Sequence, residues 1–326
     1  MKTELFIGTV GESVWYSDDL GETVTRIPSA AGFYGESGLY PESRVWALSW
    51  HPAQPQAILA GTDSGIYRFD RNARMWQHVP SPMDRTEVWA VAQSPRDPGL
   101  ILAGTRPASL YRSTDGGRSW QAVPVGFVES CPAIGRPRVT RIVFGKDDPD
   151  LVWMGVEIGG AWCSRDAGLS WTQQSEGLVS QDVHDILPVA GDPATLYATT
   201  NRGLHVSQDG GAHWQFQQLD APWQYTRALM QRADGAADVM ATNGDGPPGS
   251  AGRVFRKKGD GAWTDAALPE PLNSTPWCFA THPADPDLLF AATCHGQIFR
   301  SRDGGGSWRK LPRELGEVRT LLWLPA

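Results

Sequence analysis

The chain has 326 residues, of which 40% are apolar, and a formal net charge of −7 at pH 7. This length suits two average domains or one large all-β domain. The acidic balance, with a pI of about 5.5, argues against a basic face for nucleic acid. Fifteen tryptophans, with 36 glycines and 25 prolines, indicate short strands joined by tight turns rather than helices.

The N-terminal sequence MKTELFIGTV lacks the regions of a signal peptide, and no stretch approaches the length of a membrane-spanning segment. The four cysteines, at positions 131, 163, 278 and 294, form no C-x-x-C pair. We therefore expect reduced thiols, a cytoplasmic location and no association with membranes.

An internal repeat organises the chain from end to end. LFIGTV, SVWYSDD and TVTRI come first, then six units begin with VWALSW, VWAVAQ, VTRIVF, VHDILP, TRALMQ and PWCFAT, and VRTLLWL comes last. Each unit continues with a polar turn, a buried strand ending in Gly-Thr or Ala-Thr, a loop, and a third strand such as LYRS. An octet such as STDGGRSW and a fourth strand complete it. Four antiparallel strands per roughly 40–50 residues predict one propeller blade.

The incomplete units at the two ends of the sequence complement each other. We therefore predict an all-β, single-domain, seven-bladed β-propeller whose N- and C-terminal strands share a blade, which closes the ring without a free sheet edge. The predicted blades span 318–326 with 1–28, 45–79, 88–123, 139–174, 183–218, 226–266 and 277–311.

The octet is the most regular motif of the chain. It reads STDGGRSW at 113–120, SRDAGLSW at 164–171 and SRDGGGSW at 301–308, with variants at 17–24 and 207–214. This pattern is identified as the Asp-box, or BNR repeat, of sialidases, sortilin-like receptors, xyloglucan hydrolases and photosystem II assembly factors. The resemblance implies a WD40/YVTN/BNR-like propeller and says little about function.

We interpret the octet as a structural hairpin between the third and fourth strands. Its Asp can accept backbone N–H bonds, its second Gly allows a positive φ, and its Trp packs between blades. The alternative is a metal or acid–base role for Asp115 and its equivalents. The hairpins lie apart at the periphery, which disfavours that alternative.

Polar residues converge on the opposite face, where the first strands enter the central channel. At or beside the start of the first strands stand Trp46, Trp89, Arg138, Arg141, His184, Asp185, Arg227, Trp277 and Arg319. The loops between second and third strands add Asp63, Arg106, Glu157 and His295. Such a ring predicts a polar pocket, with tryptophans as a floor for a sugar or planar ligand. The alternative is a set of structural ion pairs around a water-filled channel.

Three subsets suggest different chemistry. His184 with Asp185 and Glu157 could act as an acid–base group. The arginines favour recognition of a carboxylate or phosphate; they are Arg106, Arg138, Arg141, Arg227 and Arg319. Cys294 with His295 could supply a thiolate or metal ligands, and His184, Glu157 and His295 could form a weakly supported metal site. No other cofactor is predicted. Three long loops, at 28–44, 124–138 and 243–252, are expected to form walls on this face.

The sequence thus predicts a propeller that binds a small polar, sugar-like or anionic ligand at the channel mouth, opposite the Asp-boxes. The sequence favours an enzyme of the hydrolase or lyase class. Glycosidase activity is implied only by the resemblance. Sialidases have six blades and xyloglucan enzymes have two facing propellers, so neither pattern is matched. The alternative is a non-catalytic propeller that binds a protein, as the assembly factors do.

Overall fold

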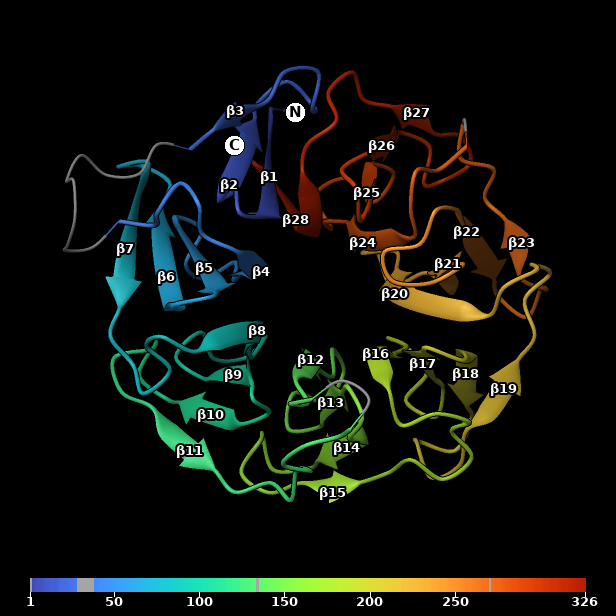
Figure 1. The fold of residues 1–326 in the computed structure, drawn as a ribbon, viewed down its shortest axis with the longest axis horizontal. Coiled ribbons are helices and arrows are strands. Elements are labelled where there is room, and N and C mark those ends of the chain that lie inside the picture. Colours follow the sequence, from blue (N-terminus) through green and yellow to red (C-terminus); the bar gives the residue numbers. More distant parts are fainter. Residues whose placement is uncertain (1, 28–37, 133–134, 270) are drawn as a thin grey trace.

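The computed structural model describes residues 2–27, 38–132, 135–269 and 271–326. In these ranges seven four-stranded antiparallel sheets surround a central channel, as Figure 1 shows. The predicted all-β, seven-bladed propeller is therefore confirmed. The described residues contain no helix that is long and apolar enough to cross a membrane.

In six blades the strands run outward from the channel in chain order, and in the closing blade the order is β28, β1, β2 and β3. The first strands are β4 (Val45–Trp50), β8 (Glu87–Gln93), β12 (Val139–Phe144), β16 (Val183–Pro188), β20 (Tyr225–Gln231), β24 (Pro276–Ala280) and β28 (Glu317–Pro325). The second strands are β5 (Ala57–Thr62), β9 (Ile101–Arg106), β13 (Val152–Val156), β17 (Leu196–Thr200), β21 (Asp238–Gly244), β25 (Leu289–Thr293) and β1 (Thr3–Val10).

The outer half of each blade is less regular. The third strands are β6 (Gly65–Asp70), β10 (Leu110–Ser113), β14 (Gly160–Ser164), β18 (Gly203–Ser207), β22 (Gly252–Lys258), β26 (Ile298–Ser301) and β2 (Val14–Ser17). The fourth strands are β7 (Met75–Val79), β11 (Gln121–Val123), β15 (Thr172–Gln173), β19 (Gln215–Gln217), β23 (Thr264–Asp265), β27 (Arg309–Lys310) and β3 (Thr25–Arg26). Most fourth strands are two or three residues long, which limits the exposed outer edge of each sheet.

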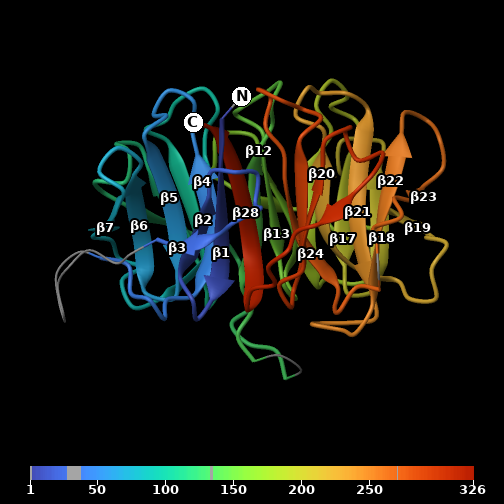
Figure 2. The same ribbon diagram turned by 90° about the horizontal axis from the view of Figure 1, so that it is seen from above.

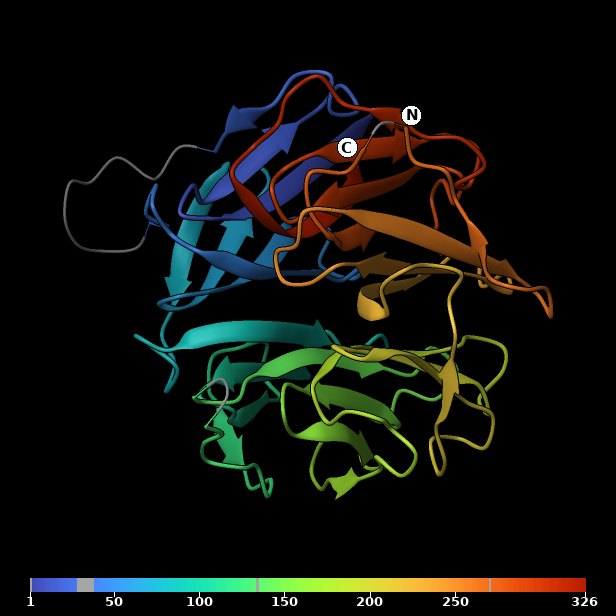
Figure 3. The ribbon, with the colours of Figure 1, turned by 45° about the vertical axis from the view of Figure 1, so that its right-hand side comes forward.

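The two ends of the chain close the ring. β28 pairs with β1 over their whole length, from Pro325 opposite Thr3 to Glu317 opposite Val10. Figure 1 and Figure 3 show both ends in this blade. Arg71, from the neighbouring blade, donates to the Glu4 carboxylate and to the Pro325 carbonyl, each at 2.7 Å. The predicted closure is confirmed, and a partly buried arginine ties it to the next blade.

Hydrogen bonds between turns define the two faces of the disc. On one face the first turn of each blade contacts the octet, as in Gly116 N to Gly99 O at 2.9 Å. On the other face the loop between second and third strands contacts the entry to the first strand, as in Glu157 N to Arg138 O at 2.9 Å. We call these the Asp-box face and the loop face. Figure 2 shows the segment before β12 projecting from the loop face.

The octets are hairpins with one recurring hydrogen-bond pattern. In the second blade that carries a full octet, the Ser170 N–H and hydroxyl both donate to Asp166, at 2.9 and 2.5 Å. The Ser164 hydroxyl donates to Asp166 at 2.7 Å and accepts the Gly168 N–H at 2.9 Å. Gly168 has a φ of 86°, which favours glycine. In the variant octet, the ring of His213 replaces the serine hydroxyl, 2.7 Å from Asp209.

Each octet also joins its blade to the preceding one. The rings of Trp214 and Trp153 pack edge to face, with centroids 6.3 Å apart. A side chain at Gly211 would collide with the Trp153 ring, so this glycine is also required for packing. The hydrogen bonds and the packing bear out the structural interpretation of the octet.

The Asp-boxes make stability depend on acid pH. Hydrogen bonds from Ser307 lower the pKa of Asp303 to about 2. A carboxylate with a depressed native pKa stabilises the fold above its unfolded pKa and loses that contribution as the pH falls. We expect stability to decline between pH ~4 and pH ~2, and Asp303→Asn to flatten this decline.

Urea denaturation at a series of pH values measures this effect. Asp260→Asn, on an exposed turn, is the control and is expected to leave the profile unchanged. An identical acid profile in Asp303→Asn and the wild type would contradict the role assigned to the octet.

Candidate functional site

A β-bulge interrupts the first strand of every blade near the loop face. The ladder between first and second strands skips Trp46, Trp89, Thr140, His184, Arg227 with Ala228, Trp277 and Arg319. A bulge leaves a residue unpaired and re-aims its side chain. The seven bulges therefore direct one level of side chains to the channel.

Five of these bulge side chains and that of Arg138, just before β12, stack into a continuous series. We call this series the mouth layer; in order it consists of Arg138, Trp89, Trp46, Arg319, Trp277 and Arg227. The Trp46 and Trp89 rings are stacked, with centroids 3.9 Å apart and an interplanar angle of 14°. Arg138 covers the other face of this pair, 3.9 Å from the Trp89 centroid.

Arg319 connects the two parts of the mouth layer. Its guanidinium lies 4.2 Å from the Trp277 centroid and 5.9 Å from that of Trp46. Arg227 lies 4.0 Å from the Trp277 centroid. The attraction between a cation and an aromatic face is stronger when both are desolvated. The stacked rings therefore hold the three arginines in place. It also covers tryptophan faces that the sequence suggested as a floor for a sugar.

The charges of the mouth layer are only partly neutralised. Arg138 pairs with Glu157 at 2.6 Å, and Arg319 contacts Glu317. Arg227 forms no ion pair among the described residues and reaches only the Tyr225 hydroxyl, at 3.5 Å. Burial lowers the pKa of Arg138 and of Arg319 to about 10, and the charge of Arg227 contributes. Arg138 and Arg319 are therefore cationic at pH 7.

Several donors in the mouth layer lack an acceptor among the described residues. They are Trp46 Nε1, Arg138 Nε, and Arg319 Nε and Nη1, all inaccessible to solvent. A buried N–H without a partner costs about 1–3 kcal/mol, so such groups are rare in folded proteins. Four of the sixteen buried side-chain polar atoms that lack a partner among the described residues belong to this one layer.

His184 is held by groups other than those the sequence suggested. Its Nδ1–H donates to the Thr226 carbonyl at 2.6 Å, and its Nε2 lies 3.5 Å from Asp182. Burial and the nearby charge of Arg227 lower the pKa of His184. The structure shows no hydrogen bond from His184 to Asp185 or Glu157 among the described residues, so the expected acid–base group is not assembled in this form.

Asp185 belongs to a second level, one residue further along the channel. It accepts the backbone N–H groups of Ile186 and Leu229, both at 2.9 Å. The Arg141 Nε lies 3.3 Å from the Asp185 carboxylate. Burial raises the pKa of Asp185, and Arg141 opposes this effect. The backbone therefore fixes the carboxylate, and the carboxylate positions Arg141 in the channel.

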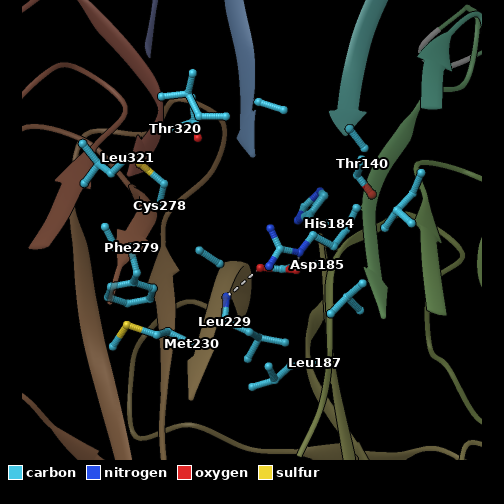
Figure 4. A pocket seen from close by; sticks show the side chains of 18 of the residues that line it. Thr140, His184, Asp185, Leu187, Leu229, Met230, Cys278, Phe279, Thr320 and Leu321 are labelled. Atoms are coloured by element: carbon cyan, nitrogen blue, oxygen red, sulfur yellow. Dashed lines mark hydrogen bonds and ion pairs between the residues drawn. The ribbon is translucent and has the colours of Figure 1, made fainter. Parts of the chain in front are cut away.

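The channel holds a cavity of about 400 Å³ that is bounded by the mouth layer. From there it extends along the first strands toward the Asp-box face. Its lining includes four cationic side chains and one carboxylate; they are Arg141, Lys146, Arg227, Arg319 and Asp185. Figure 4 shows Asp185 near His184, with Leu187, Met230 and Phe279 further along the wall. Cations are thus concentrated in the cavity of a chain whose net charge is −7.

Other predicted site residues lie at the rim. Arg106 pairs loosely with Glu87 at 3.8 Å, and the Asp63 carboxylate accepts the Arg44 N–H at 3.3 Å. His295 is exposed, away from the buried His184. Among the described residues no group of three His, Cys, Asp or Glu side chains could hold a metal, so His184, Glu157 and His295 do not form the site left open by the sequence.

The expected thiolate at Cys294 does not fit its surroundings. The side chain is buried, and its Sγ lies 3.9 Å from a Glu317 carboxylate oxygen. Burial raises the pKa of the Cys294 thiol, so the neutral form dominates at pH 7.

Of the first long loop only residues 38–44 are described after Ile27, and they lead into β4 on the loop face, where the Asp63 N–H donates to the Arg44 carbonyl at 3.1 Å. Residues 133–134 of the second loop also lie outside the described residues. In the third, Asp245 accepts the Ser250 N–H and hydroxyl at 2.8 and 2.7 Å, which closes the turn between β21 and β22.

Comparison with known proteins agrees with this architecture. The model of the BNR/Asp-box repeat matches residues 111–122. The chain is a seven-bladed propeller with BNR/Asp-box repeats. This BNR propeller is 30% identical to a xyloglucanase from Paenibacillus sp over 244 residues, which are 62% of this chain and 23% of that protein. It thus spans about a quarter of that relative's length.

Two solved structures share the fold. The GH74 xyloglucanase from Xanthomonas campestris superposes with a TM-score of 0.67 and 20% identity, over 87% of this chain and 46% of that one. YCF48 from Cyanidioschyzon merolae superposes with a TM-score of 0.58 and 17% identity, over 85% and 88%. At these identities the likeness is one of fold.

Sequence reasoning missed several residues of the cavity. Asp182 was expected at the strand entry, two positions before His184, but its pairing with His184 was not. Leu187, Met230 and Phe279 carried no signal, because an apolar residue in a first strand reads as core.

Glu157 and Arg138 form an ion pair that we expect to stabilise the fold. The side chains are 11% and 16% exposed. Glu157→Gln leaves a buried cation without its partner, so we expect a loss of about 3 kcal/mol in unfolding free energy. Glu87→Gln, in the half-exposed pair with Arg106, should cost less than about 1 kcal/mol.

Guanidinium denaturation of both variants measures the difference. Equal stability of Glu157→Gln and wild type would show that the Arg138–Glu157 pair is dispensable for the fold.

Proposed function

We propose that this propeller binds a small molecule that carries an anionic group, in the channel cavity against the mouth layer. The observation that carries the proposal is the set of buried arginine and tryptophan N–H groups without acceptors. Arg319 and Trp46, which hold three of these four donors, also line the cavity.

A bound anion would offset two unfavourable terms in the free energy of the mouth layer. Three cations held close together repel one another, and their orphan donors have lost water without gaining a partner. A carboxylate or phosphate supplies both negative charge and acceptor oxygens, which arginine binds with charge-assisted hydrogen bonds. A neutral sugar supplies no charge and would have to displace an arginine to reach the faces of Trp277.

A matched pair of probes separates charge from shape. Benzoate and benzamide have nearly the same size, but only benzoate carries an anion. We expect benzoate to raise the melting temperature by several degrees, since a ligand at about 100 times its Kd adds about 2.7 kcal/mol of stability. Benzamide should have little effect. Thermal denaturation at pH 7 with each probe measures both.

Two variants locate the binding. Arg141→Gln removes a cation of the cavity whose side chain is half exposed, and we expect it to abolish most of the benzoate effect. Arg118→Gln, exposed on the Asp-box face, should keep it. Equal effects of benzoate and benzamide, or an unchanged benzoate effect in Arg141→Gln, would contradict the proposal.

Glycoside hydrolysis is a second candidate, favoured by the 30% identity to the Paenibacillus xyloglucanase. Hydrolysis requires an acid and a base or nucleophile flanking the bond. Glu157 and Asp185 would be the carboxylates, although each pairs with an arginine here. The expected result is release of reducing ends from xyloglucan that Glu157→Gln and Asp185→Asn lose and Glu87→Gln keeps. No release by the wild-type chain would exclude this candidate substrate.

A further inference from the structure

We infer that the ligand of the channel is amphipathic: a monocarboxylate whose hydrocarbon or aromatic body fills the apolar part of the cavity. This inference rests on the proposed function, because the same arginines hold the charged end. It adds the chemical class of the rest of the ligand.

The cavity changes character along its length. Beyond the level of Arg141 and Asp185 apolar side chains join the lining, namely Leu48, Val91, Leu187, Met230, Phe279 and Leu321, beside the polar Lys146, Gln231 and Thr281. Leu48, Leu187 and Phe279 are only partly buried, although they lie on the first strands around the channel. In Figure 4 Phe279 and Met230 lie next to each other on one wall, and Leu187 lies apart from them, below Asp185. Apolar surface exposed inside a cavity favours an apolar occupant.

The sequence of the first strands produces this change. In VHDILP the polar pair His184 and Asp185 comes first, and Ile186 and Leu187 follow. The first strands PWCFAT and VRTLLWL change in the same direction. Trp277 and Cys278 come before Phe279, and Arg319 and Thr320 come before Leu321. Because the first strands all run from the loop face to the Asp-box face, the polar positions form one end of the cavity and the apolar positions form its wall.

Arg141 stands where the two parts meet. Its side chain is 49% exposed, and its Nε is the atom nearest to Asp185. It forms no other hydrogen bond or ion pair among the described residues, so its two Nη groups are available to a carboxylate. Arg227, whose guanidinium lies 4.0 Å from the Trp277 centroid, lines the same cavity and adds a second cationic side chain.

The size of the cavity selects a small molecule. A volume of about 400 Å³ lies in the lower part of the range of ligand pockets, roughly 300–1,000 Å³. The mouth layer covers the loop-face end, and Lys146 stands exposed near the Asp-box end. A single acid with a short chain or ring system matches this shape better than a polymer does.

A series of acids of equal charge tests the apolar body. Isothermal titration calorimetry with acetate, hexanoate and decanoate at pH 7 gives the affinity of each. We expect affinity to rise about three- to fourfold per methylene, and on the order of 100-fold from hexanoate to decanoate, if the added groups are buried. A negative heat-capacity change that grows with chain length should accompany the rise.

Variants assign the two ends of the ligand. Leu187→Asn, or Leu48→Asn if the first does not fold, should flatten the dependence on chain length. Arg141→Gln should weaken all the acids by a similar factor. Leu169→Asn, exposed on an Asp-box hairpin, is the matched control and should change nothing.

The outcomes separate this inference from the proposed function. Binding that Arg141→Gln removes but that does not depend on chain length overturns the amphipathic ligand and leaves the anion site. No binding of any acid, with no benzoate effect, overturns both. A chain-length dependence that is unchanged in Leu187→Asn, Leu48→Asn and Arg141→Gln places binding outside the cavity and also overturns the inference.

Discussion

A ring of β-sheets requires that every inner sheet edge be held at the same distance from a common axis, and the pairing of β1 with β28 meets this requirement. The C-terminal strand becomes the innermost strand of a blade whose other strands come from the N-terminus. Arg71 strengthens this pairing from the neighbouring blade, because it bonds to Glu4 of β1 and to Pro325 of β28. Closure brings Arg319 of β28 beside Trp46 and Trp277, which lie far from it in the sequence.

The bulges convert this ring into a site. A regular first strand would direct alternate side chains into the two flanking blades, where they would be core. The bulge adds one residue near the loop face of each blade, and its side chain enters the channel instead. The types of these residues decide the character of the channel. Tryptophan rings and arginines stack on one another there, so cations are retained in a desolvated layer with few carboxylates to neutralise them.

Sequence patterns predicted the fold and the composition of the site, but not its contacts. Octets recur in five of the seven blades and so measure the repeat, and Ser301 to Trp308 carries the same information as Ser113 to Trp120. Strand position alone predicted that Trp46, Arg227 and Arg319 would lie around the channel mouth. The stacking order, the pairing of His184 with Asp182, and the separate level of Arg141 and Asp185 depend on the direction in which each bulge turns a side chain. A single sequence does not encode that direction in its residue pattern.

The same limit explains the two chemical expectations that the geometry does not meet. Glu157 and His184 belong to consecutive blades, but His295 belongs to a blade two further along and is exposed, whereas His184 is buried. Cys294 follows a buried strand, so its thiol is desolvated rather than activated. Apolar wall residues such as Phe279 could not be distinguished from core, although they determine what the cavity can accommodate.

A crystal structure of the protein grown with decanoate tests the central claim most directly. We predict electron density for one molecule in the channel, with its carboxylate within hydrogen-bond distance of the Arg141 guanidinium and its chain along Leu187 and Phe279. An empty channel at saturating decanoate, or a molecule bound on the loop face outside the mouth layer, would contradict the claim.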